Sequence, residues 1–307
     1  MASQRDVKNK IASVKNIQKI TRAMEMVAAA RLRRAEQRIT ALRPYADAIG
    51  RMTRQAAAAA GAEALRLPLL REHESQSKVA LLLVTGDRGL AGGFNSQIIR
   101  SGVRLSAELA EQGLQSVWYA TGRRGVSSLT FRGHELSGSY TGFADKPAYA
   151  DARTIADDLM QAYVDGHVDR VEMVYNAYVS PLTQHVTLQR LLPLTGAALV
   201  GEEEEGDASA QAARDAQAQR SRATVEYEPD PEKILRRLVP DYIEISIYRA
   251  LVESAAGFFG AQMTAMRSAS ENAGEIITEY TLQMNRARQA EITQEIMEVV
   301  AGAEGLT

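Results

Sequence analysis

The chain has 307 residues, of which 45% are hydrophobic and 24% charged, with a formal net charge of −2 at pH 7. A chain of this length and balance can bury a sizeable core, which favours a globular class over a disordered or membrane-spanning one. It has no cysteine, which excludes disulfides, thiolate metal sites and a cysteine nucleophile, and its four histidines lack the spacing of metal ligands.

The first predicted element is a long basic helix over residues 1–60, with a local kink or a break at Pro44. Its first 54 residues contain 13 lysines and arginines against four acidic residues. Fifty helical residues would span about 75 Å, which is too long to pack inside a domain of this size. The apolar residues recur at steps of three and four, as in the seam of a coiled coil. They are Val7, Ile11, Val14, Ile17, Ile20, Met24, Val27, Leu32, Ala35, Ile39, Leu42, Ile49 and Met52.

Residues 77–195 alternate predicted strands and helices. The predicted strands are 78–85, 115–120, 170–179 and 185–191, and the predicted helices are 95–112, 122–131 and 148–165. Alternating strand and helix units predict a mostly parallel sheet covered by helices. Pro181 predicts a turn after which the last strand pairs back onto the one before it. We therefore expect a small, Rossmann-like α/β domain inserted between two long helices.

A glycine-rich turn, TGDRGLAGGFN at residues 85–95, follows the first predicted strand. A Walker-type phosphate loop needs Lys and then Ser or Thr directly after its last glycine, but Phe94 and Asn95 occupy those positions. The four glycines also lack the G-x-G-x-x-G spacing of a dinucleotide loop. We expect them to permit a tight turn, with Asp87 and Arg88 exposed for contact with a partner.

Residues 201–224 contain no large apolar side chain, which predicts a flexible, acidic insert rich in Ala and Gln. A second long helix is predicted over residues 230–307, with Pro231 in its first turn and Pro240 at a kink or at its true start. From Asp241 onward it carries ten acidic residues and four arginines. Its seam fits heptad spacing with Ser270 as a polar interruption, and the apolar members are Val252, Ala256, Phe259, Met263, Met266, Ala273, Ile277, Tyr280, Met284 and Ala287. An acidic and a basic helix at opposite ends of one chain favour an antiparallel coiled coil between them.

Motifs of known catalytic sites are missing from the sequence. It has no Gly-x-Ser-x-Gly elbow, no His-Glu-x-x-His and no carboxylate pair in an apolar pocket pattern. We therefore expect no catalytic residue, no metal site and no directly bound cofactor.

Three segments together resemble the gamma subunit of F-type ATP synthase, the central rotor stalk. They are KIASVKNIQKITRAMEMVAAARLRRAE at 10–36, TGDRGLAGGFN at 85–95 and NRARQAEITQEIMEVVAGA at 285–303, with LLPL at 191–194 and YEPDP at 227–231 in between. The resemblance covers nearly the whole chain. It implies a shaft inside a ring of alpha and beta subunits, joined through the α/β domain and the epsilon subunit to the proton-carrying c-ring of the membrane. Proton flow would turn this shaft and drive ATP synthesis in the head, where the catalytic subunits bind ATP, ADP and Mg²⁺.

The same resemblance implies residues that contact the ring. Arg88 is implied as a charge partner of acidic loops on the catalytic subunits, and Met24 as a shaft contact, although Met24 also reads as an ordinary seam residue. The polar residues near the C-terminus match a region that the ring grips: Arg286, Arg288, Gln289 and Thr293. The apolar residues beyond them match a tip that turns in a hydrophobic collar, with ordinary coiled-coil core as the alternative: Ile292, Ile296, Met297, Val299 and Val300.

The resemblance also implies residues at the foot of the shaft, the part that contacts the c-ring and epsilon. They are Tyr227, Glu228 and Asp230. The chain departs from the family pattern at Gln262, where some relatives carry Arg, so a charge contact there is absent or moved to Arg267. The 201–224 insert also exceeds what many relatives carry. By its position near the foot, we hypothesise that the insert modulates coupling or idle hydrolysis.

Two other functions are open from the sequence. A basic coiled coil that binds nucleic acid is motivated by the first helix, but that helix has almost no aromatic residues and the acidic helix supplies a counter-charge. A nucleotide-dependent enzyme is disfavoured by the glycine spacing. We expect no nucleic-acid partner and no membrane insertion. The lack of a signal or transit sequence favours a peripheral protein at the cytoplasmic face of a bacterial cell membrane.

Overall fold

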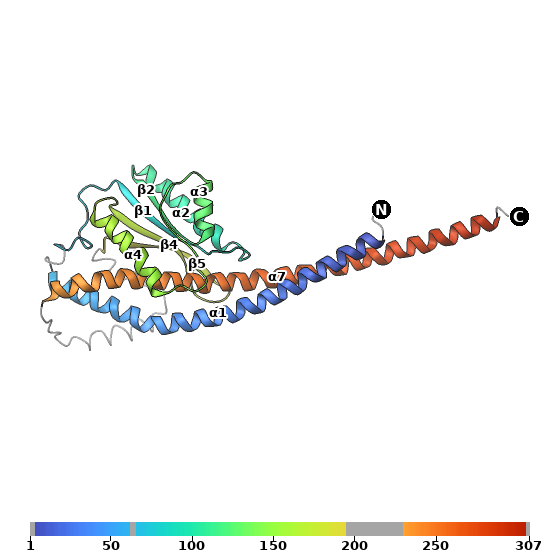
Figure 1. The fold of residues 1–307 in the computed structure, drawn as a ribbon, viewed down its shortest axis with the longest axis horizontal. Helices are drawn as coiled ribbons and strands as arrows, with labels where there is room; N and C mark the ends of the chain where they lie inside the picture. Colours follow the sequence, from blue (N-terminus) through green and yellow to red (C-terminus); the bar gives the residue numbers. More distant parts are fainter. Residues whose placement is uncertain (1–3, 62–65, 195–229, 305–307) are drawn as a thin grey trace. The chain divides into compact units, whose positions relative to one another are not determined.

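The structure, a computed structural model, describes residues 4–61, 66–194 and 230–304 (Figure 1). Its elements in chain order are α1 Gln4–Ala60, β1 Lys78–Val84, α2 Phe94–Glu111, β2 Gln115–Thr121, α3 Arg123–Phe131, β3 Leu136–Tyr140, α4 Tyr149–Val164, β4 Arg170–Tyr178, β5 Gln184–Leu192 and α7 Pro231–Glu304. The predicted insert at 201–224 and the predicted foot residues Tyr227 and Glu228 lie outside the described residues.

Both long helices continue through their internal prolines, Pro44 in α1 and Pro240 in α7. A break at Pro44 and a helix start at Pro240 are therefore wrong, because one lost backbone hydrogen bond is a small part of so long a helix. α7 begins at Pro231 instead. The carboxylate Oδ1 of Asp230 accepts a hydrogen bond from the Glu232 N–H at 3.2 Å, which is the arrangement of a helix cap followed by proline in the first turn.

The five strands form one mixed sheet in the order β3-β2-β1-β4-β5. β1 pairs in parallel with β2 and β4, β2 pairs in parallel with β3, and β5 returns antiparallel to β4 as predicted. β3 was not expected, because the segment LSGSY is short and has no apolar alternation. The strand order reverses between β1 and β4, so the loops after these two strands lie at the carboxyl edge where crossovers to opposite faces begin.

The chain divides into two units, which we call the sheet unit and the helical unit. The sheet unit comprises Leu32–Gly89 and Gly93–Phe258, and the helical unit comprises Met1–Arg31, Leu90–Gly92 and Phe259–Thr307. Each unit thus contains one segment of α1 and one segment of α7.

The core of the sheet unit lies on one face of the sheet. Ala80, Leu82 and Val84 alternate along β1 and are almost fully buried together with apolar residues of α4 and of the first part of α7. Leu83 points to the opposite face, where it packs against Gly102 of α2. Both faces of β1 are therefore covered, which accounts for its unbroken apolar sequence.

In the helical unit, α1 and α7 run antiparallel and side by side (Figure 1). Four contacts join them in order: Lys10 with Tyr280, Gln18 with Ser270, Glu25 with Arg267, and Arg31 with Phe259. The residue numbers of these pairs add to between 288 and 292, so the register is constant. By that register, Gln4 is level with about Arg286, and α7 continues beyond the described start of α1.

The α1 stripe predicted from apolar residues is wrong between residues 17 and 27. Ile17, Ile20 and Val27 are each more than half exposed, and Met24 is only half-buried. The buried and half-buried positions recur with steps of four and three at 7, 11, 14, 18, 21, 25 and 28, and three of them are the polar residues Gln18, Thr21 and Glu25. The prediction failed here because it followed the apolar side chains, which lie one residue before the true seam.

The α7 stripe agrees with the prediction from Met263 to Ala287, whereas residues 251–260 are buried on all sides. Every predicted apolar position from Val252 to Ala287 is buried or half-buried, and Ser270, the predicted polar interruption, is half-buried among them. After Ala287 the pattern ends, because every residue from Arg288 to Ala301 is exposed.

Candidate interface residues

The glycine-rich loop between β1 and α2 is held by the carboxylate of Asp87. Its oxygens accept hydrogen bonds from the backbone N–H groups of Arg123 at 3.0 Å, Gly142 at 3.1 Å and Ala144 at 3.1 Å. These donors lie at the start of α3 and in the segment between β3 and α4. The carboxylate of Asp87 therefore joins three segments of the sheet unit, and the contact of this half-buried residue with a partner stays a prediction.

Arg88 and Asn95 have different places in the same loop. The side chain of Asn95 closes the loop, because its Oδ1 accepts from the Gly86 N–H at 2.8 Å and its Nδ2 donates to the Arg88 carbonyl at 3.0 Å. The Arg88 guanidinium, in contrast, is 65% exposed and lies 3.8 Å from Asp145. A pair this exposed is weak, so Arg88 can exchange it for another carboxylate.

The crevice at the carboxyl edge of the sheet, where doubly wound folds bind nucleotides, is filled by side chains of the chain itself. The rings of Phe94 and Phe258 pack edge to face with their centroids 5.6 Å apart. The space that remains beside them is about 10 Å³, room for at most one water molecule. A Cβ on Gly86 would lie 3.0 Å from the Phe258 ring, so this glycine allows the close approach of α7. This space is too small for a nucleotide.

The predicted shaft residues of the helical unit are partly engaged within it. Arg267 pairs through Nε with Glu25 Oε1 at 2.9 Å. This is the arginine to which a charge contact could have moved from position 262. Met24 is half-buried beside the seam, which fits a contact with the ring as well as an ordinary residue of the coiled coil.

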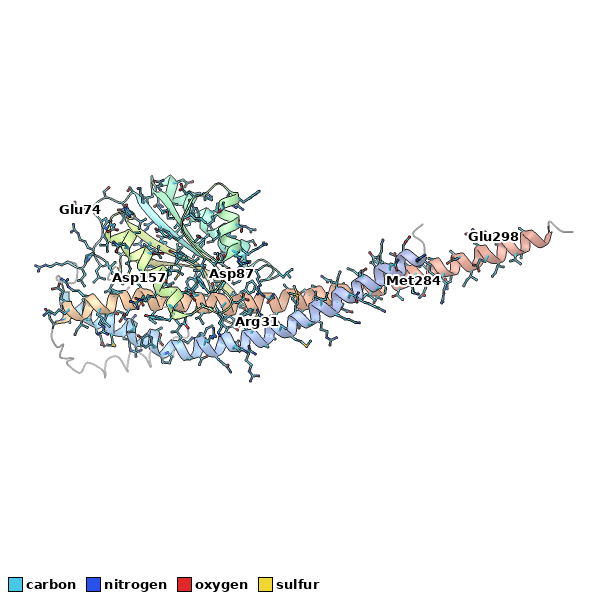
Figure 2. All side chains as sticks on the ribbon, viewed as in Figure 1. Arg31, Glu74, Asp87, Asp157, Met284 and Glu298 are labelled. Carbon is cyan, nitrogen blue, oxygen red and sulfur yellow. The ribbon has the colours of Figure 1, made fainter. Side chains whose placement is uncertain are left out.

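The predicted residues of the C-terminal tip all lie on the outer surface of α7. Arg286, Arg288, Gln289, Thr293, Ile296 and Val300 are exposed, and neither arginine forms an ion pair with another residue in the described ranges. Figure 2 shows Met284 level with the beginning of α1, and Glu298 further along α7 where no other helix accompanies it. The apolar residues of the tip, Ile292, Ile296, Met297, Val299 and Val300, are between 48% and 73% exposed.

Two hydrogen bonds between tyrosine and carboxylate tie the long helices to the α/β part of the sheet unit. Tyr178 Oη donates to Glu36 of α1 at 2.5 Å, and Tyr149 Oη donates to Glu244 of α7 at 2.6 Å. Burial and the hydrogen bond to Glu244 raise the pKa of Tyr149, so the phenol stays protonated as the donor. Sequence reasoning did not find these pairs, because their members are 95 or more residues apart.

No metal site or membrane span is found in the part of the chain that the structure covers. Within residues 4–61, 66–194 and 230–304, no three potential ligands among His, Asp and Glu converge. Over the same ranges, no helix combines the length and the apolar character needed to cross a bilayer.

Comparisons with known proteins agree with the sequence resemblance. A family profile described as ATP synthase matches residues 3–306. The ATP synthase gamma chain of Rubrobacter xylanophilus is 43% identical over 306 residues, covering 100% of this chain and 99% of that protein. The gamma chain of a Cyanothece species is 40% identical over 315 residues, with 100% of both chains covered.

Solved structures share the fold at lower identity. A chain in the Euglena gracilis mitochondrial ATP synthase, in a structure of its OSCP, F1 and c-ring parts, has a TM-score of 0.66 at 14% identity, covering 99% of this chain and 94% of that one. A chain in the central stalk and c-ring structure of the Tetrahymena thermophila mitochondrial enzyme has a TM-score of 0.57 at 23% identity, covering 82% of this chain and 99% of that one.

Proposed function

Because the chain belongs to the family of ATP synthase gamma chains, we propose that its two long helices form the shaft through which proton flow drives ATP synthesis. It is a rotor subunit and is not catalytic by itself. The alternative of a nucleic-acid-binding coiled coil receives no support from the relatives or from the structure.

The observation that carries this proposal is the uncovered tip of α7. Five apolar side chains that are roughly half or more exposed on one short helical segment would be unfavourable in water, and such patches mark surfaces that a partner covers. In the proposal, the alpha and beta subunits enclose this tip as a collar. The antiparallel contacts between α1 and α7 support the proposal that the shaft is a coiled coil. The α/β part would then be a Rossmann-like insertion between these two helices in the sequence.

Polar residues at the base of the tip are proposed to transmit torque. Arg286, Arg288, Gln289 and Thr293 are exposed, and the two arginines are available to carboxylates of the ring. A rotating shaft can bias a catalytic site only through contacts that differ in energy between the conformations of that site. Charged side chains at fixed positions around the rotating helix supply such differences, because each rotary step brings them to different subunits of the ring.

Lower on the shaft, we propose that the ring contacts the displaced apolar side chains of α1. Ile17, Ile20 and Val27 lie outside the seam with Met24 beside them, which supports the shaft contact expected at Met24. Arg88, weakly paired and exposed, is proposed to bind acidic loops of the catalytic subunits. Because the nucleotide crevice is filled, we propose that ATP, ADP and Mg²⁺ bind only the partner subunits.

The foot of the shaft is proposed to contact the epsilon subunit and the membrane c-ring. Asp230 caps the first turn of α7, which is the described end of the helix nearest to the predicted foot residues in the sequence. Tyr227 and Glu228 are assigned to the foot by sequence alone, as is the hypothesis that the 201–224 insert modulates coupling. In this arrangement the protein is peripheral, at the cytoplasmic face of the cell membrane.

The torque role is tested with the double variant Arg288→Ala/Gln289→Ala in reconstituted enzyme. We expect normal assembly but less proton pumping per ATP hydrolysed, because the base of the tip loses its polar contacts. Arg104→Ala/Gln112→Ala is a matched control, since it removes the same two side-chain types from exposed positions of the sheet unit. Wild-type torque and pumping in the tip variant would refute the assignment.

A further inference from the structure

A small hollow lies on the surface of the sheet unit between α2 and α3. These two helices lie side by side on one face of the sheet, because right-handed crossovers lead in the same direction from β1 to β2 and from β2 to β3 (Figure 1). The hollow has a volume of about 180 Å³. Its lining residues are Ser96, Ile99, Arg100 and Val103 of α2, Ser128 of α3, and Arg132 at the C-cap of α3. The four residues of α2 follow the helical repeat, so a single face of this helix forms one wall.

Positive charge in the hollow has no internal partner. Two arginines and no acidic residue are among the described residues that line it. The side chains of Arg100 and Arg132 are exposed, and neither forms an ion pair or a hydrogen bond with another described residue. Arg104, four residues after Arg100 on the same helix, differs because it pairs with Glu108 at 3.7 Å. Two guanidinium groups that line one space repel each other, and an anion between them would replace this repulsion by attraction.

The rest of the lining also fits a small anion. Ile99 is 6% exposed and Val103 is half-buried, so the inner wall of the hollow is apolar. An apolar wall lowers the local dielectric constant and strengthens a charge-assisted hydrogen bond. The hydroxyl of half-buried Ser128 has no hydrogen-bond partner among the described residues, so it is available to donate to the anion.

The carbonyl groups at the end of α3 account for only one of the two arginines. A cation is favoured at a helix C-terminus, which explains Arg132 at the C-cap. Arg100 lies in the second turn of α2, where the helix dipole gives a cation no advantage. The convergence of both side chains on one hollow therefore needs another explanation.

We propose that the hollow between α2 and α3 binds a phosphate group. Each guanidinium can donate two parallel N–H groups to neighbouring oxygens, and a tetrahedral phosphate has enough oxygens for two such forks and the Ser128 hydroxyl. The volume is below the roughly 300–1,000 Å³ of pockets for drug-sized ligands, so the hollow admits the phosphate group but not a whole nucleotide. The site is separate from the shaft role proposed above and does not depend on it.

Calorimetric titration of the full-length chain with inorganic phosphate at low ionic strength tests the site. We expect saturable binding of one phosphate per chain. The midpoint of thermal unfolding should rise with phosphate concentration, because only the folded chain has the hollow. Arg100→Gln and Arg132→Gln should each weaken binding about ten- to hundred-fold, since each removes one charge-assisted contact. Both positions are exposed, so without phosphate the variants should unfold at the wild-type midpoint.

Arg104→Gln is the matched control. It removes the same side chain from the same helix but outside the hollow, and it should change the affinity by less than about three-fold. Binding that is lost equally in Arg104→Gln would mean that the general positive charge of α2 attracts the anion, and this result would overturn the proposal.

A second arm separates a free phosphate from a lipid head group. Phe131, next to Arg132 in the sequence, is 93% exposed and could contact a lipid beside the head group. The same variants are sedimented with phosphatidylcholine vesicles, with and without phosphatidylglycerol. Binding that requires phosphatidylglycerol and is lost in Arg100→Gln and Arg132→Gln would support the site with a lipid as its source, whereas binding of inorganic phosphate alone would support a free ion. The proposal is overturned if the wild-type chain binds neither the vesicles nor phosphate up to about 10 mM, or if both variants bind like the wild type.

Discussion

Replacing Asp169 by Asn is the sharpest test of how the loop before β1 is held. The carboxylate of Asp169 is buried and accepts hydrogen bonds from the Ser77 N–H at 2.8 Å and the Lys78 N–H at 2.9 Å. It also contacts the Ser77 hydroxyl at 3.2 Å and His73 Nδ1 at 2.9 Å. One side chain thus attaches the segment between α1 and β1 to the start of β4.

The magnitude follows from the pKa of Asp169. Burial acts to raise this pKa, but the hydrogen bonds from His73, Ser77 and Lys78 outweigh it and lower the pKa from 3.8 to about 2. Since one pKa unit corresponds to about 1.4 kcal/mol, the ionised carboxylate contributes about 2 kcal/mol to the free energy of unfolding at neutral pH. The folded pKa lies below the unfolded one. This stabilisation is therefore complete above about pH 5 and is lost as the pH falls from about 4 through 2.

Urea unfolding of the full-length chain across pH 2–7 measures the effect. Asp169→Asn should be less stable than the wild type by about 2 kcal/mol at pH 7, and the difference should shrink steadily below pH 4. Asp165→Asn, at an exposed position four residues earlier, is the control and should change little. A difference between wild type and Asp169→Asn that stays constant with pH would refute the reasoning, because the ionised form would then carry no special stabilisation.

Three further substitutions test other contacts. Asp87→Ala leaves three backbone N–H groups without their acceptor and should lower the free energy of unfolding by about 2–4 kcal/mol in denaturant titrations; a loss near zero would mean that water replaces the carboxylate. Tyr149→Phe should cost about 1–2 kcal/mol, and spectroscopic titration should show one fewer tyrosine ionising above the normal range, whereas an unchanged titration would contradict the bond to Glu244. Arg267→Gln should cost less than about 1 kcal/mol, because its pair with Glu25 is partly exposed, and raising the salt concentration should reduce the difference further; a salt-independent loss would argue for packing instead of charge.

The long helices were predictable in their extent but only partly in their contacts. In α7 the apolar residues from Met263 to Ala287 repeat with the period of the seam, so pattern and burial coincide there, whereas every residue of 251–260 is buried. In α1 the seam carries Gln18, Thr21 and Glu25, while Ile17, Ile20 and Val27 lie outside it. A pattern of hydrophobicity by itself does not say which apolar residues are buried within the chain.

The site residues divide in a similar way. The exposed tip and Arg88 were indicated by family motifs in the sequence, and their contacts in the assembly remain predictions. Three other features became visible only in the backbone geometry of the structure. They are the hydrogen bonds that the Asp87 carboxylate accepts, the capping of α7 by Asp230 and the positive φ of Leu90. The Asp-Pro pair at 230–231 was the one sequence signal that could have shown the cap beforehand.

The sequence by itself determined the family, the two long helices and most of the strands, because heptad spacing, alternating strand and helix units and extended motifs are all local patterns. Only the tertiary structure decided which face of α1 is buried and which side chains hold the glycine-rich loop. It also showed that aromatic rings fill the crevice at the sheet edge. These features depend on pairs such as Phe94 with Phe258 and Tyr178 with Glu36, which lie more than 100 residues apart, and no short-range pattern records such pairs.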